Sequence, residues 1–538
     1  MTRSALALLS ILVIVPTGAH AQADDPLVAD GRALLLDVVA SFGSLQRNRD
    51  PLHTRLADQQ LERLRALETM PPELREKACR FLKRILEMKG REDSLYRLRV
   101  TAIRLIAKLA HEVSWAKYLA RVALARKGSP MVGLDFYVER NLANLRTPAH
   151  AKWLLTGLQD SRRSIRRLVL GALARLDDPK RAAMLLPALD RLCALAGDDD
   201  KEIASRAVAV LGQIESSRVF PPLVRAVTDG SALVRLAAAQ ALGRRLHVPG
   251  TVPVLARLLE DTNARVREEC VISFRRAKDK AIVPRLIARM SKEPLRLRAA
   301  LAKTLQHLVG HGFGLDPKPW QDWLKSARAA GNLDLDRGAR ATPRGRYASQ
   351  YYGIPVLSDR VLFILDVSRS MDYRAGLVAK SRLARAKQEL TKALRGLDKK
   401  SYFGVMAFSS SPLPLQRNGL VRVSERSIKR AVKWIGQQGA QGGTNSYGAL
   451  ELAFDKFPKV DTIYFLSDGS PTLGRTIVQE RIIQRVAKWN RLRGVRIHTI
   501  ALLTGDTPAH DVWEDKQDAQ RFMRALAEET GGEFLIIK

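Results

Sequence analysis

The segment VLFILDVSRSM, residues 361–371, decides the fold of the C-terminal part of the chain. Its first five residues are all apolar, which predicts a buried strand that ends at Asp366. Alternate residues of an extended chain point the same way, so Asp366, Ser368 and Ser370 should share one side of the loop that follows. The segment therefore predicts a buried strand whose end carries one carboxylate and two hydroxyls.

The residues around this segment, 359–538, alternate short apolar runs with amphipathic stretches. We expect strands at 361–365, 402–408, 462–466, 495–502 and 533–537, and helices at 383–397, 427–435, 477–489 and 522–529. Such alternation predicts a doubly wound α/β sheet that is mostly parallel. Ligands bind these sheets at the carboxyl ends of the strands, so that edge is where functional residues are expected.

Two further loops add oxygen atoms at this edge. The strand at 462–466 is followed by Ser467-Asp468-Gly469, and a glycine-rich loop before it contains Thr444 and leads into a helix. Together with the first loop they offer three hydroxyls and two carboxylates. An all-oxygen set suits a hard divalent ion such as Mg²⁺ or Mn²⁺, and no nearby Cys or His favours zinc.

The residues Asp366, Ser368, Ser370, Thr444 and Asp468, in this order, resemble the metal-ion-dependent adhesion site of the von Willebrand factor A (VWA) domain family. The resemblance covers residues 359–538 and implies a Rossmann-like α/β fold. It implies that the three hydroxyls bind Mg²⁺ or Mn²⁺ directly and that the two carboxylates act mainly through bound water. It also implies adhesion without bond-breaking, in which an acidic residue of a partner protein completes the coordination of the ion.

Arg369 departs from the commonest bacterial form of this motif, which has glycine at that position. A cation so close to the ion either weakens metal binding or points outward and steers an acidic partner toward the site. A domain that keeps the fold without binding a metal is the remaining alternative.

Residues 151–312 repeat with a period of 31 or 32 residues over their later part. Each unit has a proline, then an aspartate, and five residues later an apolar residue that is followed in most units by arginine. The prolines are Pro222, Pro253 and Pro284, and the aspartates are Asp160, Asp198, Asp229 and Asp261. Proline suits the first turn of a helix and aspartate suits the turn before the next one. The period resembles HEAT repeats and predicts an all-α solenoid.

Solenoids expose long surfaces that bind partners. The arginines of the apolar–Arg steps are Arg166, Arg235, Arg267 and Arg298. Either they form a basic ladder along one face, or each one ties its own turn. Both alternatives remain open from the sequence.

The other segments complete the predicted organisation. Thr2-Arg3, an apolar run at 5–15 and Ala19-His20-Ala21 predict a signal peptide over residues 1–21. Residues 22–150 have a helical pattern, and 313–358 form a cap and linker before the VWA domain. We therefore expect an exported protein, periplasmic or extracellular, with no transmembrane segment after cleavage.

The net charge, the cysteine spacing and the missing catalytic motifs exclude several kinds of site and partner. The formal net charge is +35, which favours acidic proteins or anionic polymers as partners. The three cysteines are far apart in sequence, which excludes a disulfide framework and a CxxC site. No G-x-S-x-G, H-E-x-x-H or Walker A motif occurs, and export argues against nucleic acid as the partner.

The leading hypothesis is an exported, non-enzymatic adhesion protein that docks an acidic partner through Mg²⁺ and presents a basic helical-repeat surface. One alternative is an envelope scaffold that binds anionic polymer through the basic solenoid. The other is an accessory subunit of a metal-insertion or other complex, against which the signal peptide argues because such machines use cytoplasmic ATP.

Overall fold

The computed structural model describes residues 64–87, 93–125, 129, 133–144, 147–176, 183–277, 280–329, 349–374, 380–503 and 516–537. The chain divides into two compact units, residues 1–222 and 223–538, and each is described by itself. The predicted signal peptide and the polar linker at 331–346 lie outside the described residues. Among the helices that are described, none combines the length and apolarity that a membrane crossing requires.

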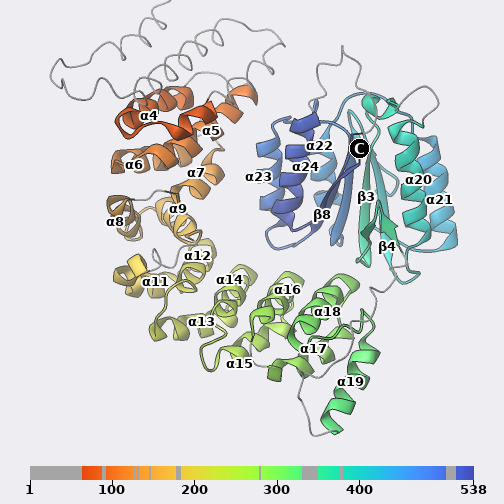
Figure 1. The fold of residues 1–538 in the computed structure, drawn as a ribbon, viewed down its shortest axis with the longest axis horizontal. Coiled ribbons are helices and arrows are strands. Elements are labelled where there is room, and N and C mark those ends of the chain that lie inside the picture. The colour runs from red at the N-terminus through yellow and green to blue at the C-terminus, as the bar shows by residue number, and fades with distance from the viewer. Residues whose placement is uncertain are drawn as a thin grey trace, which may run out of the picture. The chain divides into compact units, whose positions relative to one another are not determined.

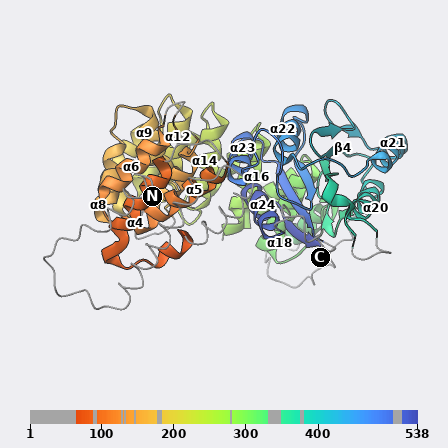
Figure 2. The same cartoon turned by 90° about the horizontal axis from the view of Figure 1, so that it is seen from above.

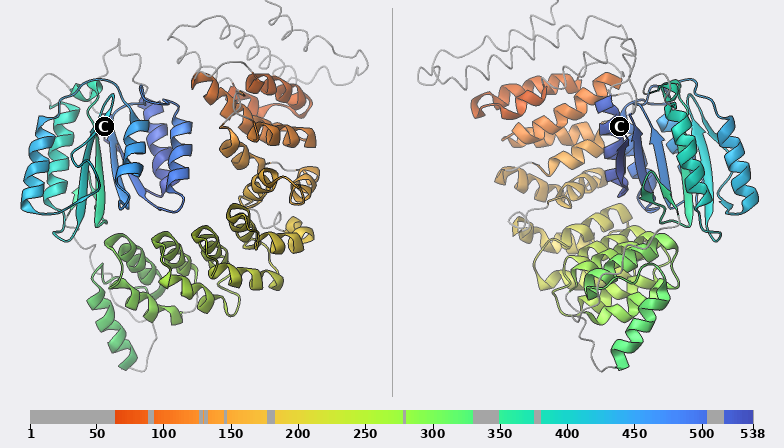
Figure 3. Two further views of the ribbon diagram at one scale, coloured as in Figure 1. Left: turned by 180° about the vertical axis from the view of Figure 1, so that it is seen from behind. Right: turned by 45° about the vertical axis from the view of Figure 1, so that its right-hand side comes forward.

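The first unit is helical throughout its described part, as the sequence pattern predicts. Its longer helices are α4 (Pro72–Glu87), α5 (Asp93–Leu109), α6 (Val113–Ala123), α7 (Asp135–Leu142), α8 (Pro148–Gly157), α9 (Arg163–Leu173), α11 (Leu189–Leu195) and α12 (Lys201–Leu211). Each of these helices turns an apolar face inward; in α9, for example, Leu168, Val169 and Leu173 are buried. The helices stack as successive hairpins within the unit (Figure 3).

The repeats continue as helix pairs in the second unit (Figures 1 and 3). The helices are α13 (Phe220–Val227), α14 (Ala232–Gly243), α15 (Thr251–Ala256), α16 (Ala264–Ser273), α17 (Val283–Met290) and α18 (Leu295–Val309). The prolines of the repeat lie in the first turn of α13, α15 and α17, and the apolar–Arg steps lie near the starts of α14, α16 and α18. The predicted HEAT-like solenoid is thus confirmed.

The repeated aspartate builds the turn between the two helices of a pair. In each repeat its side chain accepts a hydrogen bond from the backbone N–H two residues later, at 2.8–2.9 Å. The bonds are Asp160 with Arg162, Asp198 with Asp200, Asp229 with Ser231, and Asp261 with Asn263. This is the local side-chain-to-backbone bond that makes aspartate favourable in turns.

The repeated arginine links neighbouring repeats. Arg235 donates to the Asp229 carbonyl of its own turn at 2.8 Å, and to both Asp261 carboxylate oxygens of the next turn at 2.6 and 3.0 Å. Arg267 repeats the arrangement with Glu293, at 2.7 and 2.9 Å. These guanidinium groups are largely buried and neutralised, so they tie the turns together and do not form an exposed basic ladder.

A helix follows the last repeat within the segment 313–329. It is α19 (Pro317–Ala329), whose Trp320 is fully buried. The Trp320 indole N–H donates to the Gly314 carbonyl at 2.9 Å, and its ring meets Phe313 edge to face. The indole therefore holds this segment together, and α19 itself packs against α17 of the last repeat.

The described residues between 360 and 537 form the predicted α/β sheet. Its strands are β3 (Arg360–Asp366), β4 (Tyr402–Phe408), β5 (Pro412–Pro414), β6 (Val421–Arg422), β7 (Thr462–Ser467), β8 (Arg496–Leu502) and β9 (Phe534–Ile537). The order is β5-β4-β3-β7-β8-β9, with β6 beside β4. The five long strands are parallel, while β5 and β6 add an antiparallel edge. A short hairpin, β1 (Gln350–Tyr351) with β2 (Ile354–Pro355), precedes the sheet.

Helices cover both faces of this sheet (Figures 1 and 2). On one face lie α20 (Arg382–Arg395) and α21 (Glu425–Gln437), and on the other α22 (Ser446–Lys456), α23 (Gln479–Asn490) and α24 (Lys516–Thr530). Alternate residues of β3 enter the two cores, with Phe363 packing under α20 and Ile364 against the opposite layer. The run of apolar residues in β3 is therefore explained by burial on both faces.

The strand order fixes the location of the site. From β3 the chain passes to β4 on one side, and it later returns to β7 on the other side of β3. The order reverses at this point, and the loops after β3 and β7 diverge at the carboxyl ends of the strands. Asp366 and Asp468 belong to these two loops.

Candidate metal centre

Two buried carboxylates form the base of the site. Asp366 is the last residue of β3, and Asp468 directly follows β7, which is the neighbouring strand. Both side chains are fully buried, at 0% exposure. Two carboxylates so placed are unfavourable unless cations or hydrogen-bond donors compensate them.

Asp366 is held by donors on both of its oxygens. Its Oδ1 accepts from the Ser368 backbone N–H at 2.7 Å, and its Oδ2 accepts from the Ser467 hydroxyl at 2.5 Å. Burial, together with the neighbouring Asp468 carboxylate, raises the pKa of Asp366 well above its usual range. A positive charge added near this carboxyl would therefore stabilise its ionised form.

A chain of hydroxyls connects the two strand ends. After Ser368 the backbone turns into the short 3₁₀ helix η7 (Arg369–Asp372). This turn brings the Ser370 hydroxyl 3.2 Å from the Ser368 hydroxyl, and Ser370 donates to Asp468 Oδ1 at 2.9 Å. Four of the five residues predicted for the metal site are therefore directly connected through hydrogen bonds.

Thr444, the fifth residue, comes from the glycine-rich loop before α22. The loop is fastened to the first one by two backbone bonds, Arg369 N–H to the Gly442 carbonyl at 3.0 Å and Gln441 N–H to the Val367 carbonyl at 2.8 Å. Gly442 has φ +71°, a conformation that glycine adopts without strain. Thr444 is buried and its N–H donates to the Thr472 hydroxyl at 2.8 Å. The loop contacts place Thr444 at the same edge of the sheet.

Arg369 has an exposed side chain. The sequence left two possibilities, in which Arg369 either weakens metal binding or points outward. The exposure of its side chain favours the second.

The structure adds a residue that the sequence did not suggest, Arg382. Its Nη1 donates to Asp468 Oδ2 at 2.9 Å, and both side chains are fully buried. The guanidinium lies over the Tyr373 ring, 5.3 Å from its centroid. A signal was present, because Arg382 begins a helix and a cation is unfavourable at the positive end of the helix dipole unless an anion faces it.

This donor set fits a hard divalent ion. With both carboxylates ionised, the charges of Asp366, Asp468 and Arg382 sum to one negative charge, and three hydroxyls lie at the same sheet edge. Among the described residues no cluster of three or more His, Cys, Asp or Glu could hold a metal. A metal here would therefore depend on hydroxyl oxygens, which suits Mg²⁺ or Mn²⁺ better than zinc.

Comparison with known families agrees with both parts of the fold. Residues 189–274 match the model of HEAT repeats, and residues 359–534 match that of the von Willebrand factor type A domain. A solved von Willebrand factor type A protein from Catenulispora acidiphila is 21% identical; the match covers 33% of this chain and 38% of that one, with a TM-score of 0.26.

Two curated relatives match the same kind of domain. Human von Willebrand factor A domain-containing protein 3A is 28% identical over 33% of this chain, and mouse inter alpha-trypsin inhibitor heavy chain 4 is 26% identical over 25%. The matches span only 13% and 15% of those relatives' lengths, respectively. Residues 359–534 of this chain are therefore a von Willebrand factor type A domain, and HEAT repeats precede it.

Proposed function

We propose that this chain is an exported, non-enzymatic binding protein whose VWA domain captures an acidic residue of a partner protein through Mg²⁺ or Mn²⁺. The observation that carries the proposal is the pair of hydrogen-bonded hydroxyls, Ser368 and Ser370, next to two fully buried carboxylates. The Ser370 hydroxyl donates to one of these carboxylates, Asp468. The domain's relatives, one of them an inhibitor heavy chain by name, support a role in protein interaction.

Each residue has a role that follows from its contacts. Ser368, Ser370 and Thr444 would hold the ion through hydroxyls, and Asp366 fixes the Ser368 loop by accepting its N–H. Asp468 orients the Ser370 hydroxyl. The bound ion would supply an open coordination position that a carboxylate can fill. Nothing in this arrangement requires an acid, a base or a nucleophile.

The metal titration of single-site variants tests the site. Ser368→Ala removes a hydroxyl ligand, and Asp366→Asn removes a charge while keeping the shape of a side chain that the structure shows to be buried. Each should weaken Mg²⁺ binding by at least about tenfold, roughly 1.4 kcal/mol. Calorimetric titration measures this, with Ser326→Ala on the surface of α19 as a matched control.

Absence of Mg²⁺ and Mn²⁺ binding by folded wild-type protein at millimolar ion would refute the metal site. Wild-type affinity in Ser368→Ala would equally show that the ion binds elsewhere.

Export is the second part of the proposal and rests on residues 1–21 alone. The mature chain should begin near Gln22, because Ala19-His20-Ala21 is a small-residue cleavage signature. N-terminal sequencing of the protein from the periplasm or medium checks this. An intact Met1 on a cytoplasmic pool would contradict it.

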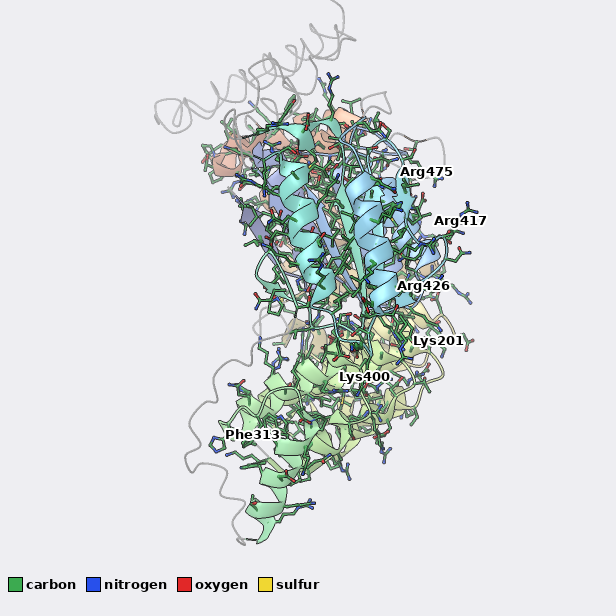
Figure 4. The ribbon with its side chains drawn as sticks, turned by 90° about the vertical axis from the view of Figure 1, so that its right-hand side faces the viewer. Lys201, Phe313, Lys400, Arg417, Arg426 and Arg475 are labelled. Carbon is green, nitrogen blue, oxygen red and sulfur yellow. The ribbon has the colours of Figure 1, made fainter. Side chains whose placement is uncertain are left out.

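The scaffold alternative has less support in the structure. Its basic ladder would need exposed repeat arginines, but Arg235 and Arg267 are engaged by carboxylates of the next turn. Exposed cations do occur elsewhere, for example Arg426 in α21 and Lys400 just before β4 (Figure 4). Binding to an envelope extract that resists EDTA but fails in high salt would favour the scaffold, and the reverse pattern favours the metal site.

A further inference from the structure

Arg382 places a permanent positive charge inside the candidate metal centre. Its side chain, like those of Asp366 and Asp468, is fully buried, so water does not screen the three charges from one another. The guanidinium bonds Asp468 Oδ2, while the Ser370 hydroxyl bonds Oδ1 of the same carboxylate. The cation and the hydroxyl ligand therefore meet on the two oxygens of one side chain.

The position of Arg382 is fixed by the surrounding fold. Its backbone N–H donates to the Tyr373 carbonyl at 3.0 Å, and the Tyr373 ring lies against the guanidinium. The next residue, Leu383, is buried in the core under the sheet. A guanidinium also keeps its charge at every physiological pH. The charge thus belongs to the site in all conditions that the protein meets.

The charge count determines what the loaded site attracts. With both carboxylates ionised, Asp366, Asp468 and Arg382 sum to one negative charge. A divalent ion turns this into one positive charge, and one carboxylate ligand then makes the site neutral. Without the arginine, the ion alone would already neutralise the two carboxylates and leave little attraction for an anion.

We propose that Arg382 is a specificity-determining residue that makes the metal centre select anionic ligands, by weakening ion binding in their absence and coupling it to carboxylate capture. The inference rests on the proposed function, since it needs an ion at this site. It explains why the partner would be acidic. With Arg382 present, the ion-loaded site has one excess positive charge, and a carboxylate of the partner neutralises it.

The test uses full-length protein with Mn²⁺ as the probe and free Mn²⁺ followed by electron paramagnetic resonance. Binding is measured in sodium chloride and in sodium acetate at equal ionic strength. Wild type should bind Mn²⁺ more tightly in acetate. Arg382→Gln should bind Mn²⁺ about tenfold more tightly than wild type in chloride and gain nothing from acetate.

Two controls separate charge from structure. Arg395→Gln removes an exposed cation from the far end of the same helix and should leave both affinities at wild-type values. Arg382→Lys keeps the charge and should retain the acetate effect. If Arg382→Gln fails to fold, Arg382→Met, which also removes the charge but keeps an unbranched side chain, takes its place with the same expected results.

Equal Mn²⁺ affinity of wild type in acetate and chloride would overturn the inference. So would an Arg382→Gln variant that is folded and binds Mn²⁺ no more tightly than wild type; in that case the proposed metal site survives and this inference alone fails. If neither wild type nor folded Arg382→Gln binds Mn²⁺, the metal site fails and takes the inference with it.

Discussion

His498 shows how one buried side chain gives the VWA domain a pH dependence. The residue lies in β8, where its ring stacks on Tyr464 at 4.8 Å and its Nδ1 accepts the Glu533 N–H at 3.1 Å. Burial, with a smaller contribution from Arg496, lowers the pKa of His498 from 6.5 to about 4. The folded state thus keeps the imidazole neutral where the unfolded chain binds a proton.

The sign of the pH effect follows from this shift. The contribution of His498 to stability is fully present above pH 6.5 and is lost as the pH falls from 6.5 to about 4. The loss approaches about 3 kcal/mol at the acid end. His498→Asn keeps an acceptor for Glu533 but cannot titrate, so the slope of unfolding free energy against pH should be smaller in this window. Urea denaturation from pH 4 to 7 measures it; identical slopes would contradict the prediction.

At the scale of elements, Glu268 of α16 joins the last repeats to the sheet. Its carboxylate, 1% exposed, accepts from Arg296 of α18 at 2.9 Å and from Arg496 at the start of β8 at 2.7 Å. Burial by itself raises the pKa of Glu268, but Arg296, Arg496 and Arg265 outweigh it and hold the pKa below its usual value. Arg296 also donates to the carbonyls of Asp461 and Gly494.

Removing this carboxylate should destabilise residues 223–538. Glu268→Gln leaves the buried Arg296 guanidinium without its counter-charge, which typically costs about 3–5 kcal/mol. Chemical denaturation measures the change, with the half-buried neighbour Glu269→Gln as the control. The wild-type contribution is present above the usual carboxyl pKa and is lost as the pH falls through the lowered pKa of Glu268. A loss no larger than that of the control would contradict the prediction.

The elements that the sequence predicted well are those with a strong pattern. β4 occupies residues 402–408 as expected, because a fully buried strand leaves a continuous apolar run. β5 and β6 were not predicted, since strands of three and two residues carry no periodicity. The five site residues could be predicted because each lies after an apolar strand or in a glycine-rich loop, and because together they resemble a known family motif. The arginine at the start of a helix was a signal that an anion faces Arg382, but it did not identify Asp468, which lies far away in the sequence.

For the whole molecule, metal binding should appear as a stability change confined to one unit. An ion that binds the folded state stabilises it by mass action, about 2.7 kcal/mol at a hundredfold excess over Kd. Calorimetry should show the transition of residues 223–538 moving upward with Mg²⁺, while that of residues 1–222 stays in place. The protein in EDTA should still melt cooperatively, because the β3 and β7 cores do not depend on the ion.

Ser368→Ala is the control for this experiment, and its transition should move little with Mg²⁺. An equal shift in the variant, or a shift of both transitions, would show that Mg²⁺ stabilises the protein through other sites.

The arginine that reaches from each turn to the next makes one repeat an exchangeable module. Deleting residues 230–261 removes one period and puts Asp229 where Asp261 stood, six residues before Arg267. Arg267 then still finds a carbonyl behind it and Glu293 ahead of it. A deletion that does not match a whole repeat breaks this register. Insertion or deletion of whole repeats can therefore change the length of the solenoid during evolution while the VWA domain that follows it stays the same.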